Sequence, residues 1–172
     1  MLLPLLTACG GQGDAAFWGF QHASVTVEGD RISGYQIWEI FTERWQRKQK
    51  DKHHVCSVVQ TLKGVQGDVE LQGCLGCEAT YDLELTFLES DCEASLHERA
   101  DLAGMTQLGI GMLSDDLEAE SPHPGVALGW FQSWDGQSAE ANGYAWQEPE
   151  PTAPVWQEGT FTLWPAVAWQ LD

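Results

Sequence analysis

The stretch Glu78-Ala79-Thr80-Tyr81-Asp82-Leu83-Glu84-Leu85-Thr86-Phe87 decides the fold class, because polar and apolar residues alternate in it without exception. Successive side chains of a β-strand point to opposite faces of the sheet, so a period of two predicts a strand with one buried face and one solvated face. Strands that are buried on one face only are typical of antiparallel sheets. This segment therefore predicts an antiparallel β-protein.

Further apolar or alternating segments lie on both sides of this strand, separated by turn-forming residues. The pair Asp135-Gly136 favours a tight hairpin turn between two of them. We predict one all-β domain over residues 16–172, either an antiparallel sandwich or an up-and-down barrel of about eight or nine strands. The other expected strands are residues 24–28, 32–45, 55–62, 68–72, 107–113, 126–134, 138–146 and 160–169.

One short helix is also expected after the alternating strand. Ser90 and Glu93 have the spacing of a capping box, in which two side chains satisfy the free amides at a helix N-terminus. Gly104 is placed to end this helix, because glycine readily adopts the left-handed conformation of a C-terminal cap.

The charge of the chain narrows the classes of partner. The 172 residues carry 8 Lys and Arg against 26 Asp and Glu, which gives a formal net charge of −18. Binding to a nucleic-acid backbone requires clustered positive charge, so we expect no nucleic-acid partner. Hydrophobic residues make up 43% of the chain, which is enough for a packed core.

The N-terminal segment ends in Leu6-Thr7-Ala8-Cys9, an apolar run closed by two small residues and a cysteine. This motif resembles the lipobox of bacterial lipoproteins, and the chain resembles uncharacterised lipoproteins of Gram-negative bacteria, myxobacteria-like ones especially. The resemblance implies that residues 1–8 are part of a signal peptide, that Cys9 carries the lipid, and that residues 9–15 form a flexible tether. Gly10 directly after the cysteine implies sorting to the outer membrane.

The four remaining cysteines are an even number, which is typical of disulfide bonds in exported proteins. A bridge between Cys74 and Cys77 would close a very short loop, so we expect each of them to pair with one of Cys56 and Cys92. The close spacing of Cys74 and Cys77 also fits a redox pair or half of a zinc site. We favour structural disulfides, and we expect neither a metal nor a cofactor.

Positive charge is concentrated in one segment of this acidic chain. Residues 44–52 have a net charge of +4, so the rest of the chain has a net charge of −22. Such a basic hairpin tip can bind anionic lipid or an acidic partner, or it can serve only for solubility. The positive residues of this segment are Arg44, Arg47, Lys48, Lys50 and Lys52.

Tryptophan is the second feature that suggests an interaction patch, because six of the nine tryptophans lie from Trp130 onward. Trp130 and Trp134 occupy one face of an expected strand, where they can fill the core or form an exposed platform for a glycan or an envelope protein. The sequence leaves both possibilities open.

Common catalytic motifs are absent from the sequence, and we predict no catalytic residues. The leading hypothesis is a lipid-anchored envelope lipoprotein that serves as a binding or structural surface module. One alternative is a β-barrel that carries a small apolar ligand, since closed barrels of about eight strands can enclose one. Another is an enzyme whose site forms only in the folded chain.

Overall fold

The structure is a computed structural model, and it describes residues 17–46, 49–67, 71–74, 76–94, 106–112, 118–119, 121, 128–133, 135–148, 158–165 and 169–171. These residues form a sheet of nine antiparallel strands. The strands are β1 (Phe17–Glu28), β2 (Arg31–Gln46), β3 (Gln49–Gln66), β4 (Ala79–Ser90), β5 (Gln107–Met112), β6 (Leu128–Ser133), β7 (Glu140–Glu148), β8 (Glu158–Pro165) and β9 (Trp169–Leu171).

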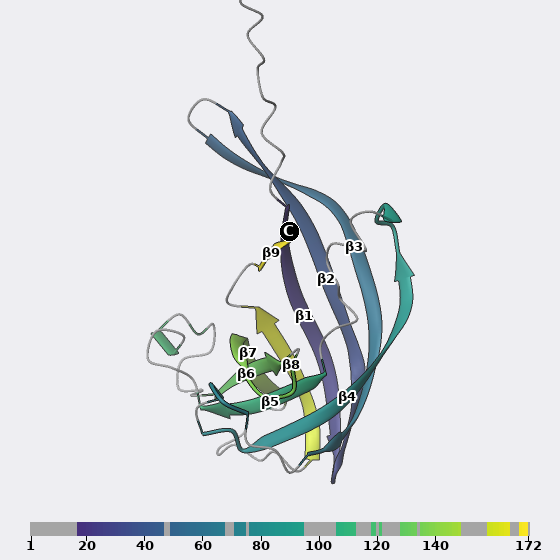
Figure 1. The fold of residues 1–172 in the computed structure, drawn as a ribbon, viewed down its shortest axis with the longest axis vertical. Coiled ribbons are helices and arrows are strands. Elements are labelled where there is room, and N and C mark those ends of the chain that lie inside the picture. The colour runs from purple at the N-terminus through teal and green to yellow at the C-terminus, as the bar shows by residue number, and fades with distance from the viewer. Residues whose placement is uncertain are drawn as a thin grey trace, which may run out of the picture.

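Strands β1 to β8 close into an up-and-down barrel (Figure 1). Each strand from β1 to β7 pairs with the next one in the sequence, and β8 closes the ring by pairing with β1. Strand β9 lies outside this ring and pairs with the first three residues of β1. The predicted all-β fold of eight or nine strands is confirmed, and the architecture is the barrel.

The alternating faces of the strands produce the inside and the outside of the barrel. Along β1 every second residue from Gly19 to Val27 is buried, and the residues between them are partly exposed. The apolar face of β4 points inward as well: Tyr81 is buried, and Leu83 and Leu85 pack against the core. Phe87, farther along this strand, remains 50% exposed.

The strands form a closed ring at only one end of the barrel, because they differ in length (Figure 1). Strands β2 and β3 have 16 and 18 residues, whereas β5 and β6 have six each. Strand β4 pairs with β5 only from Ala79 to Asp82, so β1 to β4 continue beyond the closed part as a curved sheet. Gly34 permits a close approach of β1 and β2, because a Cβ there would collide with the backbone of Ser24.

Several expected elements differ from the observed ones. The expected strand 68–72 does not form over its described part, where Gln72 makes an isolated bridge with Ser138. Strand β4 runs through Ser90, whose hydroxyl accepts a hydrogen bond from the Cys92 amide at 2.9 Å, and most of the expected helix lies outside the described residues. The expected strand 160–169 is divided between β8 and β9.

Candidate functional site

The inside of the closed part of the barrel is filled by large apolar side chains. The largest are Trp130, Tyr81 and Phe161, each about 1% exposed, and they pack with leucines and isoleucines from the neighbouring strands. Burial of the Tyr81 phenol raises the pKa of Tyr81. These side chains occupy the space in which a carrier of apolar ligands would need a cavity.

Trp130 therefore cannot belong to an exposed interaction patch, contrary to one of the two roles considered for it. Its indole Nε1 donates a hydrogen bond to the backbone oxygen of Trp164 at 3.0 Å, which satisfies the polar atom of a buried ring. Gly143 leaves the space for this contact, since a Cβ there would lie 2.7 Å from that nitrogen. Trp134 lies outside the described residues.

A chain of buried amide side chains lies above this core. Asn142 Nδ2 donates to Gln21 Oε1 at 3.1 Å, Gln21 Nε2 donates to Gln36 Oε1 at 2.7 Å, and Gln36 Nε2 donates to Gln60 Oε1 at 2.8 Å. All four side chains are buried. The chain links β7, β1, β2 and β3 across the inside of the barrel, so it joins three consecutive strands to β7, which is distant from them in the sequence.

Sequence reasoning missed this amide chain, although a signal for it exists. Gln21 precedes Ala23, Val25 and Val27 at the same spacing of two, and Gln60 lies in the same way between Val58 and Leu62. A glutamine in phase with an apolar row must point to the buried side, where its amide needs a hydrogen-bond partner.

A fifth amide, that of Gln132 on β6, is fully buried but has no hydrogen-bond partner for either side-chain atom among the described residues. We expect Gln36→Leu to lower the free energy of unfolding by about 2 kcal/mol, because it removes two hydrogen bonds between buried amides. We expect the matched control Gln132→Leu to raise it by about 1 kcal/mol, since it removes a buried polar group that is not hydrogen-bonded to the described chain. Urea unfolding of both variants measures these changes, and equal losses would contradict the expectation.

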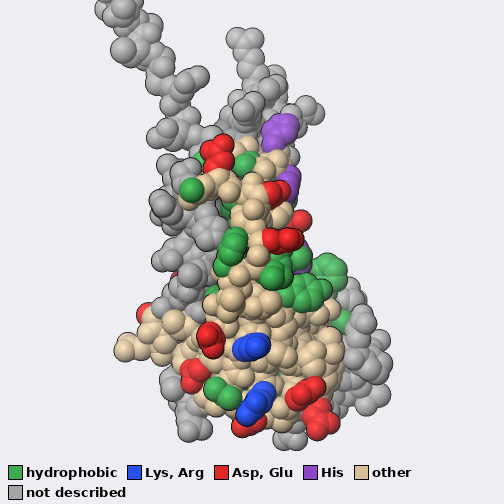
Figure 2. All heavy atoms as spheres, turned by 90° about the vertical axis from the view of Figure 1, so that its right-hand side faces the viewer, with side chains coloured by type: hydrophobic (Ala, Val, Ile, Leu, Met, Phe, Trp, Pro, Cys, Tyr) green, Lys and Arg blue, Asp and Glu red, His purple; other side chains and the backbone are tan. Residues whose placement is uncertain are grey.

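An open groove of about 590 Å³ lies on the barrel at the β1–β2 turn. Its lining includes Arg31 and Lys63, together with the carboxylates of Glu28, Asp82 and Glu84. Figure 2 shows two positive side chains low on the molecule with acidic side chains around them. A groove with both signs of charge can bind polar or zwitterionic partners by complementary contacts.

The basic segment lies at the opposite end of the barrel. Strands β2 and β3 pair through Arg44 with Asp51 and end at Gln46 with Gln49, so Arg44, Lys50 and Lys52 belong to one hairpin. Arg47 and Lys48, between the two strand ends, lie outside the described residues. Phe17, the first residue of β1, pairs with Thr42 of β2, so the chain enters the barrel at this same end.

An aromatic cluster lies beside this hairpin, where β1, β2 and β3 run together. The rings of Phe20 and Phe41 make an edge-to-face contact with centroids 5.4 Å apart, and Phe41 makes a second one with His54 at 5.4 Å. Phe20 and Phe41 are partly exposed and His54 is exposed. Figure 2 shows histidine side chains near this end of the molecule.

The disulfide pairing differs from the prediction. Cys56 on β3 is bonded to Cys92 just after β4, and Cys74 is bonded to Cys77. Antiparallel pairing of β3 with β4 ends at Val58 with Ser90, which brings Cys56 and Cys92 together. The expectation that Cys74 and Cys77 each pair outward is therefore wrong.

The Cys74–Cys77 loop packs against the outside of β5. A Cβ at Gly109 would lie 2.7 Å from the Cys77 sulfur and 2.9 Å from the Cys74 sulfur, so a side chain there would displace the disulfide. Leu71, Phe131 and Ala139 form a small apolar cluster with the two cysteines. The two cysteines whose spacing also fits a redox or zinc site form a disulfide within this loop.

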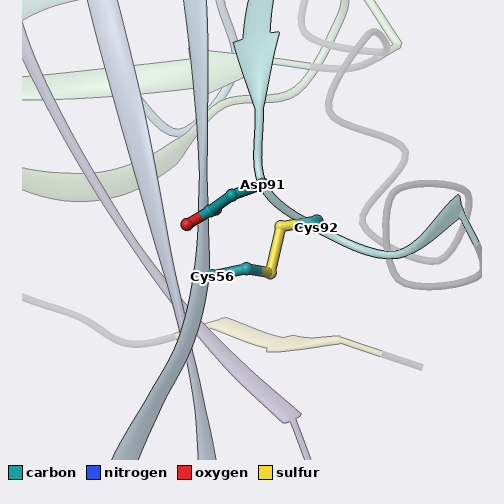
Figure 3. Close-up of side chains that lie close together, drawn as sticks. All are labelled: Cys56, Asp91 and Cys92. Atoms are coloured by element: carbon teal, nitrogen blue, oxygen red, sulfur yellow. A yellow bond between two sulfur atoms is a disulfide. The ribbon is translucent and has the colours of Figure 1, made fainter.

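Cys56, Asp91 and Cys92 lie close together (Figure 3). Both sulfur atoms belong to the disulfide, so neither is a free thiolate for a metal. Asp91 Oδ1 accepts a hydrogen bond from the Ser57 backbone amide, which ties the end of β4 to β3. This cluster has a structural role.

Asp135 organises the loop between β6 and β7, which is longer than the tight turn expected from Asp135-Gly136. Its carboxylate accepts hydrogen bonds from Ser138 Oγ at 2.7 Å, from the amides of Ser138 and Gln137 at 2.8 Å, and from Ser133 Oγ at 3.1 Å. Gly136 has a φ of 71°, a conformation that glycine adopts without strain. The hydrogen bonds from Ser138, the largest cause, lower the pKa of Asp135 well below its usual range.

We expect the contribution of this loop to the stability of the protein to depend on pH. A carboxyl group whose pKa is lower in the folded protein stabilises the fold above its unfolded pKa of about 4, and this contribution is lost as the pH falls below that value. Asp135→Asn should therefore destabilise the protein at pH 7, and the difference from the wild type should shrink as the pH approaches 2–3. Thermal unfolding of both proteins across this range measures the effect, and a difference that is constant with pH would contradict it.

No helix in the described part of the chain is long and apolar enough to cross a bilayer. Compared with protein families, with curated proteins and with solved structures, the chain has no significant match.

Proposed function

We propose that this protein is a lipid-anchored lipoprotein of the cell envelope, in the outer membrane, and that its barrel serves as a binding or structural surface module. The observation that carries the proposal is the state of the cysteines. The four that follow Cys9 are all disulfide-bonded, and disulfides persist mainly in oxidising compartments outside the cytoplasm. Cys9 alone is left over, within the lipobox-like Leu6-Thr7-Ala8-Cys9.

The geometry of the barrel supports different roles for its two ends. Strand β1 runs from Phe17 to Glu28, a span of about 36 Å at 3.3 Å per residue. Phe17, eight positions after Cys9 in the sequence, lies at the hairpin end. The groove with Arg31 and Lys63 lies at the other end, where it would face away from the membrane and towards a partner.

Metabolic labelling with a clickable fatty-acid analogue tests the anchor. We expect the protein produced from its natural gene to incorporate the label and to fractionate with membranes, and we expect Cys9→Ser to abolish both. We expect Cys9→Ser to leave the barrel unchanged, because its first strand begins at Phe17. A wild-type protein that remains unlabelled and soluble would overturn the proposal.

A further inference from the structure

One side of the barrel exterior carries a row of neutral hydroxyl and aromatic side chains that crosses five strands. Residues that pair across an antiparallel sheet point to the same face, so the strand register places this row. Its members run from β7 to β3, and each pairs with the next, in the order Trp146, Thr162, Ser24, Tyr35 and Thr61. None of them is buried, and their neighbours along the strands point into the core, so the row lies on the outside.

The outward positions on both sides of this row extend the surface over β8, β1 and β2. They are Trp164, His22 and Ile37 on one side and Thr160, Thr26 and Ser33 on the other. The row and these positions together form a surface that we call the aromatic face. It contains no Asp, Glu, Lys or Arg, although 26 of the 172 residues are acidic. A neutral ligand can therefore contact it without removing a charged side chain from water.

Two large rings of the aromatic face are about half exposed. Tyr35 is 48% exposed and Trp164 is 46% exposed. They lie on β2 and β8, with β1 between them. Strands are about 4.8 Å apart and rise about 3.3 Å per residue, so the Cα atoms of these two residues lie about 12 Å apart. The face of an aromatic ring is electron-rich and attracts the C–H groups of a ligand.

Hydroxyl groups lie between and beside the two rings. Ser24 and Thr162 belong to the same row as Tyr35, and the hydroxyls of Thr26 and Thr160 lie 3.3 Å apart in the next row. A hydroxyl can both donate and accept hydrogen bonds. Thr26 also lines the open groove of about 590 Å³, so the aromatic face continues into a hollow of the surface.

We propose that the aromatic face binds a neutral oligosaccharide. A sugar ring has a face of C–H groups, which stacks on an aromatic ring, and a rim of hydroxyls, which require hydrogen-bond partners. Exposed rings with hydroxyls between them supply both. A lipid tail or an apolar protein surface would leave the Ser and Thr hydroxyls without partners, which is unfavourable. The inference names the ligand class of the proposed binding module, and it rests on that module but not on the lipid anchor.

Calorimetric titration of the full chain carrying Cys9→Ser tests this inference without the lipid. The probes are the hexasaccharides of chitin, cellulose and amylose, with polygalacturonate as an anionic comparison. We expect at least one neutral probe to bind with a dissociation constant of about 1 mM or lower. Its affinity should change less than about twofold between about 0.05 M and 0.5 M salt, because no ion pair forms.

Variants of the two exposed rings locate the site. Tyr35→Ala should weaken binding about tenfold, because it removes a stacking surface at the centre of the aromatic face. Tyr35→Phe keeps the ring and should weaken binding less than about threefold. Trp164→Ala should also weaken binding about tenfold. Circular dichroism checks that each variant remains folded.

Phe87→Ala is the matched control. Phe87 is 50% exposed, but it pairs with Gln60 and so points to the inner side of the sheet. We expect this variant to change binding less than about twofold. Equal losses in Tyr35→Ala and Phe87→Ala, tighter binding of polygalacturonate than of the neutral probes, or no binding of any neutral probe would overturn the proposal. If a sugar binds but Cys9 is unlabelled in cells, only the anchor fails.

Discussion

Replacing Trp130 by alanine is expected to lower the free energy of unfolding by about 3–5 kcal/mol, because the change leaves a large cavity in the core. Trp130 is 1% exposed and packs between strands on the inside of the barrel. The substitution also removes the hydrogen bond from the indole to the backbone of Trp164. A loss of this size is a large part of the stability of a typical domain.

Trp164→Ala is the matched control, because this tryptophan lies nearby on β8 with its side chain 46% exposed. We expect it to cost less than about 1 kcal/mol, since little burial is lost and its backbone oxygen remains in place. Urea unfolding followed by circular dichroism measures both variants. If Trp130→Ala were as mild as Trp164→Ala, the proposed packing of the barrel would be wrong.

Removing the Cys56–Cys92 disulfide is also expected to lower the free energy of unfolding by a large amount. The bond joins residues 36 positions apart, and the chain-entropy relation gives a stabilisation of about 4 kcal/mol for a loop of that length. We therefore expect the double variant Cys56→Ala with Cys92→Ala to unfold at a much lower urea concentration. The loss acts where the pairing of β3 with β4 ends, beside the Asp91 contact with Ser57.

Cys74→Ala with Cys77→Ala provides the comparison, because these cysteines are only three positions apart. The same relation gives about 2 kcal/mol for this shorter loop. Digestion under non-reducing conditions should yield one peptide pair that joins Cys56 to Cys92. A peptide that joins Cys74 to either of them, or equal losses in the two double variants, would contradict the observed pairing.

The strands were the most predictable part of the structure. The alternation from Glu78 to Phe87 predicted β4, and its apolar face points to the inside of the barrel over Tyr81, Leu83 and Leu85. This succeeded because the two-residue period of a strand is a local property that depends on the backbone alone. The alternation in 68–72 spans only five residues, and the expected strand did not form over its described part.

The candidate sites were much less predictable. The amide chain depends on side chains from four strands. The spacing within a strand indicates that Gln21 and Gln60 point inward, but not which amide each of them meets. The pairing of Cys56 with Cys92 follows from the register of β3 against β4, and an argument from loop length alone gave the wrong partners. Trp130 could be assigned to the core only when its neighbours on β5 and β7 were known.

The amino-acid sequence by itself determined the fold class, the approximate strands, the segregation of charge and the even number of cysteines after Cys9. Only the tertiary structure decided that the sheet closes into a barrel, which cysteines pair, and that the basic hairpin and the N-terminal end of β1 share one end while the groove occupies the other. The physical reason is that alternation and charge are written along the chain, whereas closure and register arise from hydrogen bonds and packing between strands that are far apart in it.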